Sequence, residues 1–279
     1  MRRVFAALIV IAALMATSAV LAQGRPFQLP SHAQEVAPGI FYLGAGRDID
    51  GRLVEGLAFV RKAPEFRSNG MGQGMGGGGG GGGCFAVLAR DAAWIVTEPY
   101  RIDPTVVNNA NLSSSDIRSE TALALQAWNS AADFLVFGSE EAGAVDGADE
   151  VSPDGLNEVL FAPISGSGTI AVTITWGIFS GPPSGRELVE WDTVFDDDGD
   201  WLWGNAGPTD ENGCNPSVCD DTIMDFRSIA QHEYGHAAGL GHPGSSCTEE
   251  TMFAFATEGE TKKRTLNAGD IAGMVDLYQ

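Results

Sequence analysis

The chain has 279 residues, and its 37 acidic side chains outnumber its 16 basic ones, which gives a formal net charge of −21. Because so acidic a chain repels phosphates, we expect no nucleic-acid partner. Hydrophobic residues make up 44% of the chain, which is enough for a sizeable buried core and argues against wholesale disorder.

The first 22 residues have the pattern of a secretory signal peptide. Residues 1–3 read Met-Arg-Arg, residues 4–15 are an apolar run, and residues 20–22 read Val-Leu-Ala, which suits a signal peptidase. We therefore expect a signal peptide over 1–22, secretion of the mature chain, and no stable membrane insertion after its removal. An uncleaved membrane anchor is the alternative, although the apolar run is short for a span.

Export permits disulfide bonds between the four cysteines. Cys214 and Cys219 lie five positions apart in a segment rich in Asn, Gly, Pro and Asp, so they are the favoured pair. Cys84 and Cys247 then remain for a second bridge. Sequence does not fix this connectivity, and free thiols are the alternative.

Composition divides the exported chain into three parts. Residues 23–69 contain apolar alternation at Ile40–Leu43 and Leu53–Val60, which predicts short strands in a leader region that is a candidate propeptide. Residues 70–83 end in eight consecutive glycines and indicate a flexible linker. Phosphate binding by this tract is disfavoured because no Lys-Ser/Thr follows it. Residues 84–279 have the length of one compact domain.

Within that domain, the pattern predicts strands and helices in mixed order. We expect a strand over Trp94–Ile102 with a bend at Pro99, and then a helix whose cap and apolar stripe run from Ser113 to Ala132. Strands are predicted at Glu158–Phe161 and Thr169–Trp176, followed by a late helix. This order favours an α/β (α+β) fold, a mixed sheet with helices packed on it.

The strongest functional signal is an H-E-x-x-H-x-x-G-x-x-H motif near the C-terminus. His232 and His236 are four residues apart, so on a helix both imidazoles face the same ion. Gly239 supplies the permissive backbone that lets the chain leave the helix and return His242 as a third ligand. Glu233 lies beside the first ligand, where a carboxylate can accept a proton from the attacking water.

Three neutral imidazoles and one open position are the donor set of a catalytic zinc ion. We therefore predict one zinc, bound by His232, His236 and His242, with Glu233 as general base. One alternative is that the histidines are ordinary helix residues. Another keeps the metal without catalysis, but the retained Glu233 argues against a disabled site.

The motif is the signature of the metzincin metallopeptidases, and its surroundings resemble the matrixin branch, in particular its microbial members. Residues 236–243 are similar to the end of the matrixin active-site helix, and Thr251-Met252-Phe253 lies where that family has its Met-turn, with Met252 beneath the zinc. Residues 266–278 resemble the final matrixin helix. Residues 94–102, 124–128 and 154–159 carry further likeness, so the resemblance covers about residues 84–279.

The resemblance implies a metzincin fold: a mixed twisted sheet with an active-site helix, a Met-turn and a C-terminal helix. It also implies a secreted, monomeric zinc endopeptidase whose polypeptide substrate pairs antiparallel with the edge strand Thr169–Trp176. Two other functions remain open. The chain is alternatively a secreted metal-binding or adhesion module without turnover, or a zinc hydrolase that acts on a non-peptide bond.

The sequence departs from animal matrixins at their second, structural zinc. Val194 stands where a histidine ligand is expected, and only His32 lies outside the catalytic trio, so we predict a single zinc. Asp196, Asp198 and Asp200 alternate around a glycine and offer oxygen ligands to calcium. A solvated acidic turn is the equal alternative.

Three further residues have a chemical and a structural interpretation. Cys84 precedes the domain, but its surroundings do not match the family's inhibitory cysteine, so a disulfide or a buried thiol is favoured over a switch. Tyr234 within the motif and Phe253 after Met252 are interpreted as packing residues rather than catalytic groups.

Overall fold

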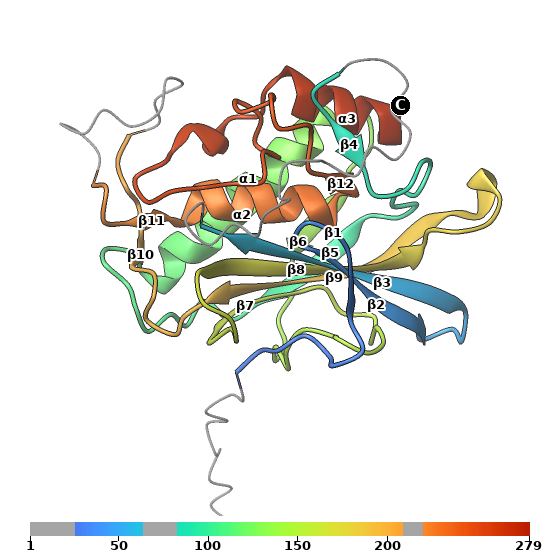
Figure 1. Ribbon diagram of the computed structural model, residues 1–279, viewed down its shortest axis with the longest axis horizontal. Coiled ribbons are helices and arrows are strands. Elements are labelled where there is room, and N and C mark those ends of the chain that lie inside the picture. Colours follow the sequence, from blue (N-terminus) through green and yellow to red (C-terminus); the bar gives the residue numbers. More distant parts are fainter. Residues whose placement is uncertain (1–25, 64–82, 209–219) are drawn as a thin grey trace, which may run out of the picture.

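The computed structural model describes residues 26–63, 83–208 and 220–279. An eight-stranded mixed sheet in the order β1-β2-β3-β8-β9-β7-β5-β6 carries helices on one face (Figure 1). The predicted α/β class is therefore confirmed. The sheet strands are β1 (Gln34–Ala37), β2 (Ile40–Arg47), β3 (Leu53–Lys62), β5 (Glu98–Ile102), β6 (Phe137–Glu140), β7 (Glu158–Ala162), β8 (Thr169–Ile178) and β9 (Glu187–Asp196).

Two small two-stranded sheets and the helices complete the described chain. The sheets pair β4 (Ala86–Val87) with β12 (Leu240–Gly241), and β10 (Trp203–Gly204) with β11 (Met224–Asp225). The α-helices are α1 (Ser114–Ala131), α2 (Phe226–Ala237) and α3 (Ala268–Tyr278), with short 3₁₀ turns at Pro183–Gly185 and Lys262–Arg264. No helix within the described ranges combines the length and the apolar character that a membrane crossing requires.

Helix α1 forms where its cap and its apolar stripe predict. The Ser113 side chain accepts a hydrogen bond from the backbone N–H of Asp116, whose carboxylate accepts one from the N–H of Ser113 in return. The helix buries one stripe, which consists of Ile117, Thr121, Ala124, Leu125 and Trp128. The Trp128 indole N–H donates to the carbonyl of Gln231 at 2.8 Å, which fixes α1 against α2.

Helix α2 is buried along its length, so capping and packing, not one-sided amphipathicity, define it. Asp225 caps its first turn by accepting from the N–H of Ser228 at 2.9 Å, and the same carboxylate pairs with Arg264. The helix ends near Gly239, which adopts a left-handed φ of 97°. The chain then reverses into β12 and carries His242 back toward the helix.

The leader strands β1, β2 and β3 belong to the same eight-stranded sheet as the strands that follow the glycine tract. β3 pairs antiparallel with β8 over a register that runs from Glu55 opposite Gly177 to Lys62 opposite Thr169. β9 pairs antiparallel with the other side of β8. The expectation that β8 is an edge strand is therefore wrong, because a strand of the chain itself occupies that edge (Figure 1).

Most of the predicted elements are confirmed, and the exceptions are local. The strands expected at Ile40–Leu43, Leu53–Val60, Glu158–Phe161 and Thr169–Trp176 all form, as does the helix that resembles the last matrixin helix. The strand expected from Trp94 begins only at Glu98, because Trp94 leaves the sheet and donates its indole N–H to the carbonyl of Ala237. β6 and β9 were not predicted.

Several predictions fall on residues outside the described ranges. These are the signal peptide at 1–22, nearly all of the glycine-rich linker at 70–83, and the pair Cys214 and Cys219. Cys84 and Cys247 are described, and they form a disulfide with a Cα–Cα distance of 5.5 Å across 163 positions. Because this bond uses the Cys84 thiol, an inhibitory switch by that cysteine is contradicted.

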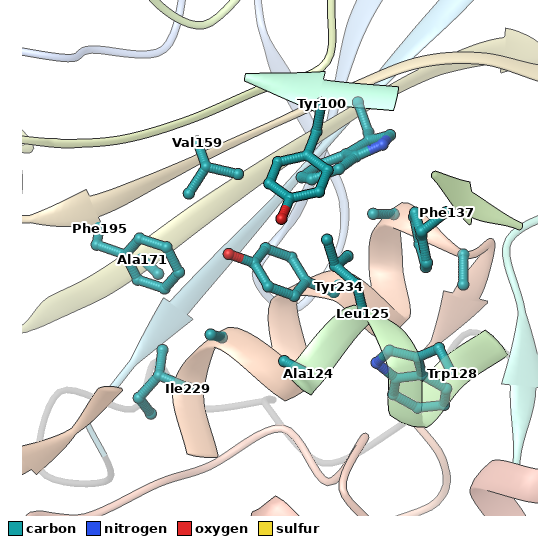
Figure 2. Packing of buried hydrophobic residues seen from close by; sticks show 14 of the residues in the cluster. Tyr100, Ala124, Leu125, Trp128, Phe137, Val159, Ala171, Phe195, Ile229 and Tyr234 are labelled. Carbon is teal, nitrogen blue, oxygen red and sulfur yellow. The ribbon is translucent and has the colours of Figure 1, made fainter. Parts of the chain in front are cut away.

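The main core lies between the sheet and the helices. Figure 2 shows Leu125 and Trp128 of α1 packed with Tyr234 of α2, beneath Tyr100 and Val159 of the sheet. The Tyr234 phenol lies 3.3 Å from the Thr121 hydroxyl and the ring is fully buried. This packing holds α2 rigidly, so the histidines on its opposite side have fixed positions.

Candidate metal centre

The three histidines of the motif converge on one point. The Nε2 atom of His242 lies 3.2 Å from Nε2 of His232 and 3.1 Å from Nε2 of His236. Two nitrogens bound to one tetrahedral zinc ion at about 2.1 Å lie roughly 3.4 Å apart. The observed spacing is close to that value. The described chain thus gathers three imidazoles in the arrangement that the sequence predicted.

Backbone carbonyls fix which ring nitrogens are free for a metal. His232 Nδ1 lies 2.7 Å from the carbonyl oxygen of Thr251, and His236 Nδ1 lies 2.8 Å from that of Leu240. A carbonyl only accepts hydrogen bonds, so both Nδ1 atoms carry the proton. The Nε2 atoms of His232 and His236 therefore each present a lone pair to the shared point. In zinc sites, a hydrogen bond from the other ring nitrogen to a carbonyl orients the imidazole in the same way.

Burial keeps these rings neutral. It lowers the pKa of His236 to about 3, and it lowers the pKa of His232 and His242 well below the ordinary value of 6.5. The nearby positive charge of Arg61 adds to the shift of each ring. Three neutral imidazoles whose Nε2 atoms converge on one point are the donor set of a zinc ion, so the residues present fit zinc.

Glu233 has one carboxylate oxygen bonded and the other without a partner. Its Oε2 accepts a hydrogen bond from the Thr173 hydroxyl of β8 at 2.8 Å, while Oε1 has no hydrogen-bond partner among the described residues. Burial raises the pKa of Glu233 to about 7, against the lowering effects of Arg61 and Thr173. A carboxyl with that pKa is suited to exchange a proton near neutral pH.

The Met-turn lies directly beneath the histidines. A Cβ on Gly235 would contact the Sδ atom of Met252 and lie 2.7 Å from the Trp128 ring, so only glycine lets α2 approach this closely. The Asp270 carboxylate accepts from the N–H groups of Thr251 and Met252, at 2.8 and 3.0 Å. The expected position of Met252 next to the metal-binding helix is thus observed.

A buried lysine also holds the Met-turn. Lys263 is fully buried, and its ammonium group lies within 3.4 Å of the carbonyls of Glu250, Thr251 and Phe253. Burial lowers its pKa to about 7. Since the Thr251 carbonyl also accepts from His232, Lys263 is linked to the metal centre through one carbonyl group.

The other residues that the sequence analysis considered lie outside the group of three histidines. The His32 ring nitrogen lies 2.8 Å from the Leu43 carbonyl, and His32 is absent from the metal-compatible clusters of the described residues. Tyr234 lies in the core and Phe253 packs edge-on against Phe255, as expected for packing residues. Val194 is also buried in a hydrophobic cluster.

The acidic loop after β9 brings its carboxylates together. Asp196, Asp198 and Asp200 offer oxygens that lie within 4.8 Å of one another. Asp196 is 1% exposed, and its Oδ2 has no hydrogen-bond partner among the described residues. Burial, followed by the charge of Asp198, raises the pKa of Asp196 to about 7.

Strand β3 covers the metal centre. The Phe59 ring stacks on His236 with 4.1 Å between ring centroids and 14° between planes. Arg61, two residues along the same face, is 1% exposed, and its guanidinium has no hydrogen-bond partner among the described residues. His232, His236 and Glu233 are each 0% exposed, so these side chains are closed to solvent in this structure.

Sequence reasoning missed four residues that shape this site: Thr173, Gly235, Lys263 and Arg61. Gly235 occupies a position of the motif at which any residue is allowed. Glycine is required there because Met252, which is distant in sequence, lies against it. Thr173 lies on β8. The alternation of residues predicted this strand but not which of its side chains would contact Glu233. Arg61 carried no signal, because a charged residue at a strand end ordinarily faces solvent.

Comparison with known proteins gives the same assignment. Residues 173–279 match the model of the Matrixin family. Matrix metalloproteinase-25 of Mus musculus is 33% identical over 116 residues, which are 42% of this chain and 16% of that protein. Metalloendoproteinase 5-MMP of Arabidopsis thaliana is 35% identical over 99 residues, which are 36% of this chain and 24% of that protein.

These matches are partial, and the matched segment spans less than a quarter of either relative. The match to the Matrixin model includes the motif helix, the Met-turn and the last helix, which are among the parts from which the resemblance was predicted. The sheet, the active-site helix and the converging histidines agree with that assignment. Over residues 173–279, the chain is similar to the Matrixin family.

Proposed function

We propose that the chain is a secreted, zinc-dependent endopeptidase. The observation that carries this proposal is the convergence of the Nε2 atoms of three neutral imidazoles on the helix that also carries the partly unpaired carboxylate of Glu233. The names of the matched relatives support it, because both are metalloproteinases. The signal-like pattern of residues 1–22 supports secretion.

In this proposal His232, His236 and His242 hold one zinc ion. Zinc supplies Lewis-acid polarisation of the scissile carbonyl and of the attacking water. Glu233 accepts the proton of that water on Oε1 and delivers it to the leaving amine, so no acyl-enzyme is formed. Thr173 donates to Oε2 and holds the carboxylate in one orientation.

A peptide substrate would pair with β8 along the side that β3 occupies in the structure. Thr173 on this strand contacts Glu233, so a polypeptide aligned along β8 passes beside the general base. β3 forms that ladder now, in the antiparallel direction that the resemblance implies for substrate. Cleavage therefore requires the leader strand to leave β8.

Calcium binding at the acidic loop supports this scaffold. We place a calcium ion between Asp196, Asp198 and Asp200, because the buried and unpaired Oδ2 of Asp196 belongs to that cluster. Asp196 also accepts from the N–H of Ile164 at 2.7 Å, so a cation there would brace the loop that leads into β8. Loss of calcium from this loop would lower thermal stability without removing zinc.

The rival function is a secreted module that binds metal without turnover. A comparison of casein cleavage by the mature chain, its Glu233→Gln variant and chelator-treated protein separates the two. The proposal predicts chelator-sensitive cleavage and a loss of at least about 10²-fold in kcat for Glu233→Gln with zinc retained. The rival predicts zinc in both proteins and cleavage in neither. A zinc hydrolase of another class would leave every peptide substrate intact while acting on a different bond.

A further inference from the structure

The Met-turn is held between two buried groups of opposite charge. The Asp270 carboxylate accepts hydrogen bonds from the N–H groups of Thr251 and Met252, at 2.8 and 3.0 Å. The Lys263 ammonium donates to the carbonyls of Glu250 and Thr251, at 3.3 and 3.4 Å. The N–H and the carbonyl of a trans peptide group point in opposite directions. Two successive peptide groups of the turn are therefore each bound by an anion at the N–H and by a cation at the carbonyl.

Lys263 is buried in a site with one acceptor for each of its protons. Burial of an ammonium group is costly, because the group loses its hydration. Lys263 is 0% exposed, and the carbonyl of Phe253 is its third acceptor, at 3.0 Å. Its Nζ also lies 3.7 Å from the Glu260 carboxylate and 5.4 Å from the centre of the Phe253 ring. Three carbonyls match the three N–H donors of an ammonium group, so this site suits the charged side chain.

The Thr251 carbonyl connects Lys263 to the metal centre. Its oxygen lies 2.7 Å from Nδ1 of His232, so it accepts from that ring as well as from Lys263. A carbonyl oxygen has two lone pairs and can accept both bonds. The Thr251 hydroxyl donates to the carbonyl of Lys263 at 3.3 Å in return. Thr251 and the 3₁₀ turn that contains Lys263 are thus joined in both directions.

The position of this carbonyl determines how His232 faces the metal. Because a carbonyl only accepts, it keeps the proton of the ring on Nδ1 and the lone pair on Nε2. Rotation of the peptide group between Thr251 and Met252 would turn the carbonyl away, and either ring nitrogen could then carry the proton. This rotation would break the bonds to Lys263 and to Asp270 together. Lys263 therefore opposes a movement that would release His232.

His236 provides an internal comparison, because its carbonyl partner has a different support. The Nδ1 atom of His236 lies 2.8 Å from the carbonyl of Leu240. Leu240 belongs to β12 and pairs with Val87 of β4, so the backbone of a small sheet holds this residue. Thr251 belongs to a turn, and a charged side chain holds its carbonyl. A change at Lys263 should therefore affect His232 and leave His236 as it is.

We propose that Lys263 is a positioning residue of the metal centre, which fixes the orientation and the tautomer of His232 through the Thr251 carbonyl. This inference rests on the proposed zinc peptidase and deepens it, since it names a residue outside the histidine motif on which zinc binding depends. Removal of a group that orients a metal-binding histidine typically changes metal affinity by about 10- to 100-fold. Lys263 acts on the same carbonyl that orients His232, so its removal should weaken zinc binding.

The alternative is that Lys263 only stabilises the fold. It joins residues 250–253 to the 3₁₀ turn Lys262–Arg264, so its loss should lower the free energy of unfolding under either account. Stability alone therefore does not separate the two accounts. A difference between His232 and His236 does separate them, because both rings belong to α2 and a general loosening of that helix would affect both.

Zinc affinity and proton NMR of the purified chain test the proposal. Lys263→Met removes the ammonium and keeps an apolar side chain, so we expect zinc to bind about tenfold or more weakly. In the zinc-loaded variant, the Nδ1 proton of His232 should exchange with solvent faster, whereas that of His236 should not change. Lys262→Met is the matched control, because Lys262 donates to another carbonyl of this region, that of Thr248, at 2.9 Å. Both readouts should be unchanged in the control.

Zinc affinity equal to that of the unchanged chain, or a His232 proton that exchanges no faster, would overturn the proposal. Equal acceleration of the His232 and His236 protons would also overturn it. Lys263→Gln keeps an amide donor without the charge, and it replaces the Met variant in both measurements if that protein does not fold. Neither measurement depends on cleavage. An unchanged chain that binds zinc but cleaves no peptide would overturn the peptidase function alone and leave the role of Lys263 in place.

Discussion

Phe59 of the leader strand stacks on His236 of the metal centre, with ring centroids 4.1 Å apart. The two residues are far apart in sequence, and the ladder between β3 and β8 brings them together. This contact makes the leader part of the site rather than an appendage. The following predictions test separate parts of that arrangement.

Thr173 positions the general base. Replacing it with Val removes the hydrogen bond to Glu233 Oε2, which favours the ionised carboxylate. We expect the pKa of Glu233 to rise and the acidic limb of the pH–rate profile to move to higher pH, with kcat reduced roughly tenfold. Thr97→Val at an exposed site is the control. An unchanged profile would show that Thr173 has no such role.

Gly235 permits the close approach of α2 to the Met-turn. Gly235→Ala would force Met252 and Trp128 to move, so we expect a loss of about 1–3 kcal/mol in the free energy of unfolding. Gly244→Ala is the matched control, because a Cβ at Gly244 has no neighbour within 4 Å. Urea denaturation of both variants provides the measurement, and equal stability would contradict the packing argument.

The Cys84–Cys247 disulfide closes a loop across 163 positions. Its loss in a Cys84→Ser, Cys247→Ser double variant should cost about 2–5 kcal/mol, mainly by releasing the unfolded chain. Thermal melting measures this effect. Because no thiol from Cys84 reaches the metal, thiol-modifying reagents should not activate the intact protein. Rapid activation by such a reagent would restore the inhibitory-cysteine hypothesis.

The burial of Glu190 predicts how the stability of the protein depends on pH. Burial and the charges of Asp192, Asp149 and Asp154 raise the pKa of Glu190 from its ordinary 4.5 to about 10. The folded state therefore holds a proton that the unfolded state releases, and its contribution to stability is complete below about pH 4.5 and is lost as pH rises toward 10.

The protein should accordingly lose stability between pH 5 and pH 8, and Glu190→Gln should reduce this slope. Denaturant unfolding across the pH range measures the difference between the two proteins. A slope identical in both proteins would rule out Glu190 as its source.

The sequence predicted the metal ligands because their chemistry depends on local spacing. His232 and His236 share a helix, and Gly239 allows the short return to His242, so no distant contact had to be known. Strand β9 was missed because the burial of its polar residues depends on contacts that are distant in sequence. Glu190 and Asp192 interrupt its apolar pattern, although both are buried in the structure.

The course of the leader was equally hidden. Alternation predicted β2 and β3 as strands, but the partner of a strand is set by long-range packing, which a pattern of period two does not encode. Arg61 shows the same limit, since only the fold brings its charge close enough to lower the pKa of Glu233. Local chemistry was therefore predictable, and the closure of the site was not.

X-ray absorption spectroscopy of the purified mature chain, combined with its metal content, tests the central claim most directly. We expect one zinc per chain with three imidazole nitrogens at about 2.0–2.1 Å, and loss of that ion in His242→Ala. Correctly folded protein without a transition metal, or zinc whose ligands are unaffected by His242→Ala, would contradict the account.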